Sequence, residues 1–463
     1  MRKMAGLALM IGAALAAGCN SNNDSSTPAP GAKNVIFFLG DGMGLNTLTA
    51  ARIYGVGEEG SLTIDTLPET AFIKTFSHDA QVTDSAPSMS AYMTGVKSNN
   101  GVISMDSDAT QESNCSKSAG KPVTTLLELA KAAGRGTGVV TTTRVTHATP
   151  AATYAHLCNR DLEADIAAQL VPGGVGYNSA LKEGVDVVLG GGSSFFRPLA
   201  DKGKREDGRN LIDEMKAKGY QFAGNLDELN KAEAGKPLLG LFGSSHMKYD
   251  LDRPASEPSL TQMTLAAIKQ LKDQKQGYFL MVEGGRIDHA LHDTNAKRAL
   301  QDTLAFDNAI KATIDEVKKT DPELKNTLIV VTADHDHTLV LNGYAKRTGK
   351  TTADNPGVLG LVKNYETGEP SKDADGMPYT IIGFGNGYNR VDGPRSSVAP
   401  LDDATVSAND YHQEVVVKVG EIGNETHGGT DVFLGAIGQG ADSFHGSLDN
   451  TAVFGKVKAA AGL

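Results

Sequence analysis

Short apolar runs alternate with amphipathic segments along most of the chain. The runs are continuous, rich in Val, Ile and Leu, and mostly end in Gly or Asp, which is typical of parallel strands buried on both faces. They predict strands at 33–40, 137–143, 185–192, 278–284, 327–334 and 379–385. Periodic segments between them predict helices at 124–133, 162–170, 210–218, 259–274 and about 288–320. This alternation predicts an α/β fold, a three-layer sandwich with a mainly parallel central sheet.

The alternation breaks at about 341–410, where Gly, Pro and Asp are frequent and the apolar runs are short. We interpret this segment as an insertion into one domain that spans 32–463. In parallel sheets, functional residues gather at the carboxyl ends of the strands. We therefore expect the insertion to lie over the active-site edge and to shape access to it.

Residues 1–19 have the pattern of an export signal. Arg2 and Lys3 precede an apolar run, Met4–Ala17. That run is shorter than the ~20 residues that a membrane-spanning helix needs. We therefore predict a signal peptide and an exported protein.

The end of this signal resembles a bacterial lipoprotein box. Its last residues, 15–19, read LAAGC, which predicts a lipid anchor on Cys19. Simple cleavage near Ala17, without a lipid, is the alternative. Residues 20–31 are rich in Ser, Asn and Pro and predict a flexible tether. The expected location is the periplasm, or the outer membrane as a lipoprotein.

The cysteines agree with export. Three cysteines are too few for a disulfide scaffold, and they include no CxxC pair for a structural zinc ribbon. In an oxidising periplasm Cys115 and Cys158 are expected to form a disulfide bond, and two buried free thiols are the alternative.

Composition excludes several classes of protein. The chain has 44 Lys and Arg against 55 Asp and Glu, a formal charge of −11, so we expect no nucleic-acid-binding surface. Hydrophobic residues at 40% and charged residues at 21% exclude a wholly disordered chain and a multi-span membrane protein.

Asp41 lies in a glycine-flanked turn, LGDGMG at 39–44, directly after the first predicted strand. The spacing is not GxGxxG, and an acid in such a turn would repel a pyrophosphate unless a cation lay between them. We favour a metal ligand, and an ordinary Asp turn or helix cap is the alternative.

Acidic and histidine side chains also follow two other predicted strands. Asp288 and His292 are four residues apart at a helix start, so their side chains share one face and can hold one ion. Asp334 and His335 close the strand near residue 330, and His427 lies in a glycine-rich turn. Carboxylate oxygen and imidazole nitrogen suit zinc. One such pair is often only a cap or a surface pair, but two clusters after buried strands predict a metal site.

Ser85 is the candidate nucleophile. Pro87 fits the first turn of a helix, so Ser85 would stand at a helix N-terminus, where free amides and the helix dipole stabilise an alkoxide or a phosphoryl group. A metal-activated serine is the functional interpretation, and a serine N-cap is the alternative. A Ser-His-Asp triad is a third option, although the chain has no G-x-S-x-G elbow around this serine.

Taken together, the motifs resemble those of the alkaline phosphatase family. In chain order they are LGDGMG (39–44), VTDSA (82–86), THATP (146–150), CNR (158–160), VEGGRIDHALH (282–292), TADH (332–335) and ETHGG (425–429). The resemblance implies the α/β fold of that family, with the insertion as a crown that contributes to a homodimer contact. It also implies small phosphomonoester substrates.

The resemblance further implies a site with two zinc ions and one magnesium ion. The implied ligands are Asp288, His292 and His427 for one zinc, Asp41, Asp334 and His335 for the other, and Asp41, Thr149 and Glu283 for magnesium. Ser85 would attack the phosphomonoester, and water would then hydrolyse the phosphoserine. Arg160 would clamp two phosphate oxygens with its planar fork, which a lysine does less well.

Three further histidines have open roles. His337 either orients Asp288 from outside the metal shell or is a packed side chain. His147 and His289 occupy positions that are Asp and Lys in some bacterial members and His in others. They leave the third metal open, because imidazole favours zinc or cobalt over magnesium, and we expect His147 to act through water or from outside the metal shell.

The chain departs from the common family pattern at Pro87 and Met89. The local string resembles the nucleophile region of related sulfatases, which expect a basic residue at the position of Met89. A phosphodiesterase or sulfatase of the same superfamily is therefore the main alternative function, and Arg160 argues against it. A non-catalytic metal- or phosphate-binding protein is the remaining alternative.

Overall fold

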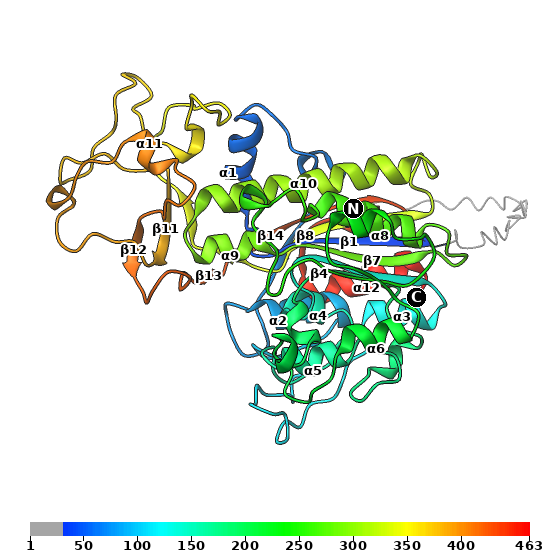
Figure 1. Ribbon diagram of the computed structural model, residues 1–463. Helices are drawn as coiled ribbons and strands as arrows, with labels where there is room; N and C mark the ends of the chain where they lie inside the picture. The colour runs from blue at the N-terminus through cyan, green and yellow to red at the C-terminus, as the bar shows by residue number, and fades with distance from the viewer. Residues whose placement is uncertain (1–30) are drawn as a thin grey trace, which may run out of the picture. The chain divides into compact units, whose positions relative to one another are not determined.

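A ten-stranded sheet runs through the part of the chain that this computed structural model describes, residues 31–463 (Figure 1). The strand order is β15-β2-β14-β8-β1-β7-β3-β4-β6-β5. The strands are β1 (Asn34–Gly40), β2 (Glu69–Lys74), β3 (Gly136–Arg144), β4 (Val187–Gly191), β5 (Gln221–Ala223), β6 (Leu238–Leu241), β7 (Tyr278–Gly284), β8 (Thr327–Ala333), β14 (Val432–Gly438) and β15 (Gly446–Asp449). The predicted signal peptide, the lipidation of Cys19 and almost all of the tether lie outside the described residues.

The sheet is parallel apart from β14. β14 pairs antiparallel with both β8 and β2, whereas the other pairings are parallel. The central strands are buried along nearly their whole length, as their continuous apolar runs predict. This confirms the predicted α/β fold with a mainly parallel sheet.

The register of the three central strands positions the candidate chemistry. Gly40 at the end of β1 pairs with Gly284 at the end of β7 and with Ala333 at the end of β8. The turns that follow these three strands therefore leave the sheet side by side. Asp41 and Asp334, one residue beyond their strands, are brought together in this way.

Helices cover both faces of the sheet (Figure 1). On one side α10 packs against α1, α8 and α9, and on the other α2 packs against α12, α3 and α4. The helices are α1 (Leu45–Val56), α2 (Ser85–Thr94), α3 (Leu126–Ala132), α4 (Ala148–Ala151), α5 (Glu163–Ala168), α6 (Leu211–Ala217), α7 (Leu226–Asn230), α8 (Leu260–Leu271), α9 (Arg286–His292), α10 (Ala296–Lys318), α11 (Asp403–Val406) and α12 (Asn450–Ala461). No helix within residues 31–463 is long and apolar enough to cross a membrane.

The long helix predicted at about 288–320 is wrong, because the chain breaks it into α9 and α10. Thr294 has a positive φ of 53°, which a helix cannot contain. Asn295 then caps α10, since its side chain accepts a hydrogen bond of 3.0 Å from the backbone N–H of Arg298. The break lets α9 end at His292.

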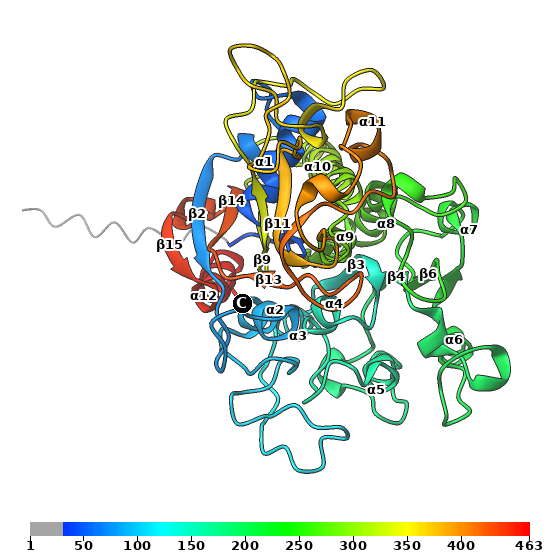
Figure 2. The ribbon, with the colours of Figure 1, turned by 90° about the vertical axis from the view of Figure 1, so that its left-hand side faces the viewer.

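A small separate sheet spans the segment predicted as an insertion and the residues on either side of it. β10 (Leu339–Leu341), β11 (Ile382–Gly387) and β12 (Val415–Lys418) pair in that order, apart from the central sheet. The run at 379–385 overlaps β11, the strand of this sheet that lies within 341–410. Figures 1 and 2 show this segment, in yellow and orange, at the end of the sheet where α9 lies.

A two-stranded pair, β9 (Asp336–His337) with β13 (His427–Gly428), lies under the insertion. His337 and His427 are register partners in this pair. The pairing therefore brings the two histidine-bearing turns together, although 88 residues or more separate them in sequence.

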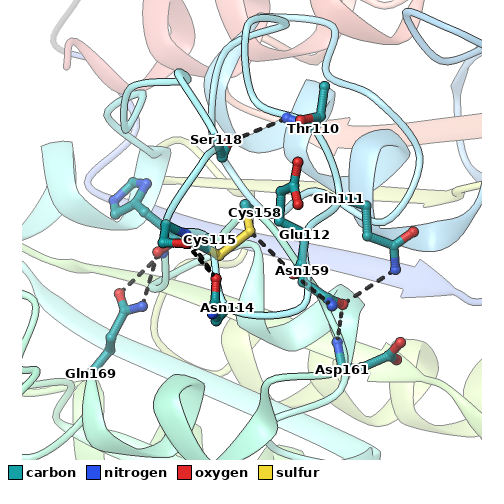
Figure 3. Close-up of a disulfide and its surroundings, with 12 residues drawn as sticks. Thr110, Gln111, Glu112, Asn114, Cys115, Ser118, Cys158, Asn159, Asp161 and Gln169 are labelled. Atoms are coloured by element: carbon teal, nitrogen blue, oxygen red, sulfur yellow. Dashed lines mark hydrogen bonds between the residues drawn. A yellow bond between two sulfur atoms is a disulfide. The ribbon is translucent and has the colours of Figure 1, made fainter.

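Cys115 and Cys158 form a disulfide bond with a Cα–Cα distance of 5.5 Å, which confirms the predicted pairing. The bridge closes 43 residues of chain. Figure 3 shows the bridge between the loop that carries Asn114 and the segment that carries Asn159.

We predict that Asn295→Ala lowers the free energy of unfolding by about 1–2 kcal/mol. The fully buried Asn295 caps α10 and also donates 2.9 Å to the carbonyl of Asn409, so the variant loses a cap and leaves a carbonyl unpaired. Urea unfolding measures the loss. Asn225→Ala, at the partly exposed cap of the five-residue helix α7, is the control and should cost less. An equal loss of unfolding free energy in the two variants would contradict the role of Asn295 in ending α9 and starting α10.

Candidate active site

The turns after β1 and β8 meet in a buried cluster of acidic and imidazole groups. Asp41, Asp334 and His335 are all fully buried. His335 Nε2 lies 3.3 Å from Asp41 Oδ1 and 3.5 Å from Asp334 Oδ2. The backbone N–H of Gly42 donates to Asp334 Oδ1 at 3.0 Å and fixes that carboxyl group. These three side chains have the geometry of a cation site.

Ser85 points into this cluster from the first turn of α2. Its Oγ lies 3.2 Å from His335 Nε2 and 3.4 Å from Asp41 Oδ1, and the residue is 2% exposed. Ser85 is not the cap of α2: Asp84 is, accepting 2.7 Å from the backbone N–H of Ala86. The alternative of a serine N-cap is therefore wrong, and the Ser85 hydroxyl is left free to face the cluster.

A second cluster lies beside the first. His292 Nε2 and His427 Nε2 are 3.2 Å apart, and Asp288 Oδ1 lies 3.3 Å from the first and 3.5 Å from the second. The ring of His427 stacks on that of His335 at 3.5 Å between centroids, which joins the two clusters. His427, whose side chain is 14% exposed, therefore belongs to these clusters and is not a surface histidine.

Backbone carbonyls fix the tautomers of these ligand-type histidines. Nδ1 of His292 donates to the carbonyl of Glu425, Nδ1 of His427 donates to that of Thr83 at 2.8 Å, and Nδ1 of His335 donates to that of Asp336 at 3.2 Å. A carbonyl only accepts, so in the neutral rings each Nε2 carries a lone pair. The two Nε2 atoms at 3.2 Å therefore cannot bond to each other, and a shared cation would satisfy both.

His337 is held between two carboxyl groups. Its Nδ1 donates to Glu425 Oε2 at 2.5 Å and its Nε2 donates to Asp288 Oδ1 at 2.8 Å. Burial opposes a charge here, but the Glu425 and Asp288 carboxylates outweigh it and raise the pKa of His337 well above its usual value. Carboxylates engage both nitrogens of His337, and the contact of its Nε2 orients Asp288.

Glu283 and Thr149 approach Asp41 from the other side. Thr149 Oγ1 donates to Asp41 Oδ2 at 3.3 Å. Glu283 is the last residue but one of β7, where it accepts from Thr141 and, at 3.2 Å, from Thr143. Ligand atoms of Asp41, Glu283 and His147 lie within 4.8 Å of one another. Oxygen donors from Asp41, Glu283 and Thr149 make this the most oxygen-rich of the three groups.

Buried acids of like charge disfavour ionisation in this region. Burial and the charge of Asp288 raise the pKa of Asp41 to about 7, and burial and the charge of Asp41 raise that of Asp334 to about 8. Burial also raises the pKa of Glu283 well above its usual value. Within residues 31–463, Asp334 Oδ2 and Glu283 Oε1 are buried without a hydrogen-bond partner. Cations would satisfy both the charge and the free oxygens.

Arg160 reaches the rim of the site beside Ser85. Its guanidinium lies 3.5 Å from Asp84 Oδ1 and donates to His147 Nε2 at 3.1 Å. Its side chain is 20% exposed, so the group faces solvent at the mouth of the site. From this position the planar guanidinium can donate two hydrogen bonds to an anion that lies next to Ser85.

His147 and His289 join a third histidine, His246, in a cluster of their own. The ring centroids are 4.2 Å apart for His246 and His289 and 5.3 Å apart for the other two pairs. Burial lowers the pKa of all three, which keeps them neutral. His289 accepts 2.8 Å from Arg286, so the structure places it outside the acidic clusters.

Two residues of this region were not predicted from the sequence. Glu425 is the first residue of the ETHGG motif, two residues before His427, and this position could have indicated its role. His246 follows β6, a short strand that the apolar pattern did not predict, so its strand-end position was hidden. All the other candidate residues in the described part of the chain lie at this one edge of the sheet.

Comparison with known proteins identifies this arrangement. The alkaline phosphatase family model matches residues 32–463. The human tissue-nonspecific alkaline phosphatase is 38% identical over 456 residues, which cover 90% of this chain and 81% of the human protein. The membrane-bound alkaline phosphatase of Bombyx mori is 37% identical over 463 residues, covering 91% of this chain and 78% of that protein.

The fold agrees with this result. The crystal structure of Thermus thermophilus alkaline phosphatase has a TM-score of 0.68 with this chain and 27% sequence identity, and the match covers 94% of this chain and 92% of that one. The chain therefore belongs to the alkaline phosphatase family of phosphomonoesterases.

Proposed function

We propose that this chain hydrolyses phosphate monoesters through a phosphoserine on Ser85, at a site that holds two zinc ions and one magnesium ion. The observation that carries the proposal is the position of the Ser85 hydroxyl. It lies within 3.4 Å of both His335 and Asp41 and next to unpaired, buried metal donors. The products are an alcohol and inorganic phosphate.

The donor chemistry of each group fits these ions. Asp288, His292 and His427 offer two imidazole lone pairs and a carboxylate within 3.5 Å of one another. Asp41, Asp334 and His335 offer one imidazole and two carboxylates, and both sets suit zinc. Asp41, Glu283 and Thr149 offer only oxygen, which suits magnesium. When bound, such ions supply a Lewis acid that lowers the pKa of a hydroxyl group and balances the phosphate charge.

The protein residues then have separate tasks. Asp84 caps α2 and so aims the Ser85 Oγ at the buried cluster, where the hydroxyl loses its proton. The Oγ attacks phosphorus, the bond from phosphorus to the ester oxygen breaks, and the leaving oxygen takes a proton from water and departs as the alcohol. Water then attacks the phosphoserine and releases inorganic phosphate, which restores Ser85.

Arg160 and His337 act around this exchange. We assign Arg160 to bind two phosphate oxygens, and its contact with Asp84 supports this because it places the guanidinium next to the nucleophile. His337 and Glu425 hold the Asp288 carboxylate in one orientation. His147 offers a ligand atom within 4.8 Å of those of Asp41 and Glu283, and we assign it to act on this group through water or from outside its ligand shell. His289 contacts Arg286 instead.

The domain organisation and the location of the enzyme belong to the same proposal. Residues 32–463 would form the catalytic domain, with the crown-like insertion at about 341–410 shaping access and contributing to a homodimer. The signal peptide would export the enzyme to the periplasm, where the Cys115–Cys158 bridge is stable. Lipidation of Cys19 would anchor it to the outer membrane.

We predict that Ser85→Ala lowers kcat on an aryl phosphate at least about a thousandfold, because water must then attack unaided. Acid quenching of the unaltered enzyme with labelled phosphate should trap label on Ser85, and the variant should trap none. Ser90→Ala on the same helix is the matched control, since its hydroxyl contacts only backbone atoms. Near-native turnover by Ser85→Ala would contradict the covalent mechanism.

We predict that Arg160→Ala weakens competitive inhibition by inorganic phosphate by roughly 1–3 kcal/mol, about 5- to 150-fold. The variant loses charge-assisted hydrogen bonds to the phosphate oxygens. The phosphate inhibition constant of Arg160→Lys should lie between those of the native enzyme and Arg160→Ala, because lysine keeps the charge and lacks the planar guanidinium. Inhibition constants at one pH and one ionic strength measure the effect. An unchanged constant would show that Arg160 does not bind phosphate.

A further inference from the structure

The segment that carries Arg160 has no helix or strand to hold it. α4 ends at Ala151, and α5 begins only at Glu163. On one side, backbone hydrogen bonds fix the segment: Ile103 and Leu157 exchange bonds of 2.8 and 3.0 Å, and the N–H of Arg160 donates to the carbonyl of Gly101 at 2.8 Å. These contacts attach it to the chain that follows α2.

On the other side, the two residues that precede Arg160 are each fixed to one loop (Figure 3). Cys158 is bonded to Cys115. Asn159 donates from Nδ2 to the carbonyl of Glu112 at 3.0 Å, and its Oδ1 accepts from Gln111 Nε2 at 3.2 Å. The loop thus holds this segment through one covalent bond and two hydrogen bonds.

Gly101 connects this arrangement to the nucleophile. Its N–H donates to Asp84 Oδ2 at 2.5 Å, while its carbonyl accepts from Arg160. Its φ is +80°, a left-handed conformation that favours glycine. Because Asp84 caps the helix of Ser85, the distance between Ser85 and Arg160 depends on how the Arg160 segment is held.

We propose that the Cys115–Cys158 disulfide and Asn159 are positioning elements for Arg160, and that they set the affinity of the site for the phosphate group. The inference rests on the phosphate-binding role proposed above for Arg160. The bridge lies two residues before Arg160 in the chain, and Cys158 is 1% exposed, so the covalent anchor meets the segment at a buried position. Without these anchors the guanidinium keeps its charge but loses its fixed place beside Ser85.

The test is a double-mutant cycle on the metal-loaded enzyme. Its four proteins are the native chain, the pair variant Cys115→Ser with Cys158→Ser, Arg160→Ala, and the triple variant. The phosphate inhibition constant, KM, kcat and the zinc content are measured for each. We expect the pair variant to weaken phosphate inhibition and raise KM by about tenfold, with kcat changed less than about twofold and zinc content unchanged. In the Arg160→Ala background the same pair of changes should have no further effect.

Asn159→Ala, combined with Arg160→Ala in the same kind of cycle, provides a second test that leaves the disulfide intact. It decides the question if the cysteine variant does not fold, and it should act in the same direction. Asn114→Ala is the matched control from the same loop: Asn114 is exposed and accepts hydrogen bonds only from Ser116. It should leave the phosphate inhibition constant unchanged.

The outcomes separate the two proposals. If Arg160→Ala alone leaves phosphate inhibition unchanged, the role proposed for Arg160 fails, and this inference fails with it. If Arg160→Ala weakens inhibition but the anchor variants do not, or weaken it equally with and without Arg160, only this inference is overturned. A loss of phosphate affinity that requires Arg160 supports it.

Discussion

The structure depends on one electrostatic constraint: four carboxyl groups are buried together at the carboxyl edge of the sheet. These are the carboxyl groups of Asp41, Glu283, Asp288 and Asp334, each at most 3% exposed. Burial and like charge raise the pKa of Asp41 and Asp334, whereas the His292 and His337 imidazoles outweigh burial and lower the pKa of Asp288. Cations between these carboxyl groups would compensate their charge and, in the same place, could activate a hydroxyl group. The position of Ser85 at this edge joins the constraint to the chemistry.

The strand pairing of the central sheet brings these carboxyl groups together. Parallel pairing of β1 with β7 and β8 aligns the strand ends, so acidic residues that are far apart in sequence leave the sheet together. Backbone carbonyls then bind Nδ1 of three histidines and leave Nε2 free for a ligand. In the same way, His337, held by Glu425, donates a hydrogen bond to the Asp288 carboxylate and orients it. Rigid supports of this kind keep donors in place before any ion or substrate binds.

Sequence patterns predicted the central strands and the residues at their ends, because buried parallel strands have a distinct apolar signature. They did not predict β14, whose antiparallel direction depends on pairing partners, or the break at Thr294, where tertiary contacts override a continuous helical pattern. His246 was missed because β6 is only four residues long. The disulfide followed from export and cysteine count, but its attachment beside Arg160 emerged only from the fold.

The most direct test of the central claim is the rate of the mature enzyme on matched aryl phosphate, aryl phosphodiester and aryl sulfate, after chelation and after restoration of zinc and magnesium. The account predicts that the chelated enzyme is inactive, and that zinc with magnesium restores fast turnover of the monoester alone. Turnover that survives complete removal of metal, or restored turnover that favours the diester or the sulfate, would contradict it.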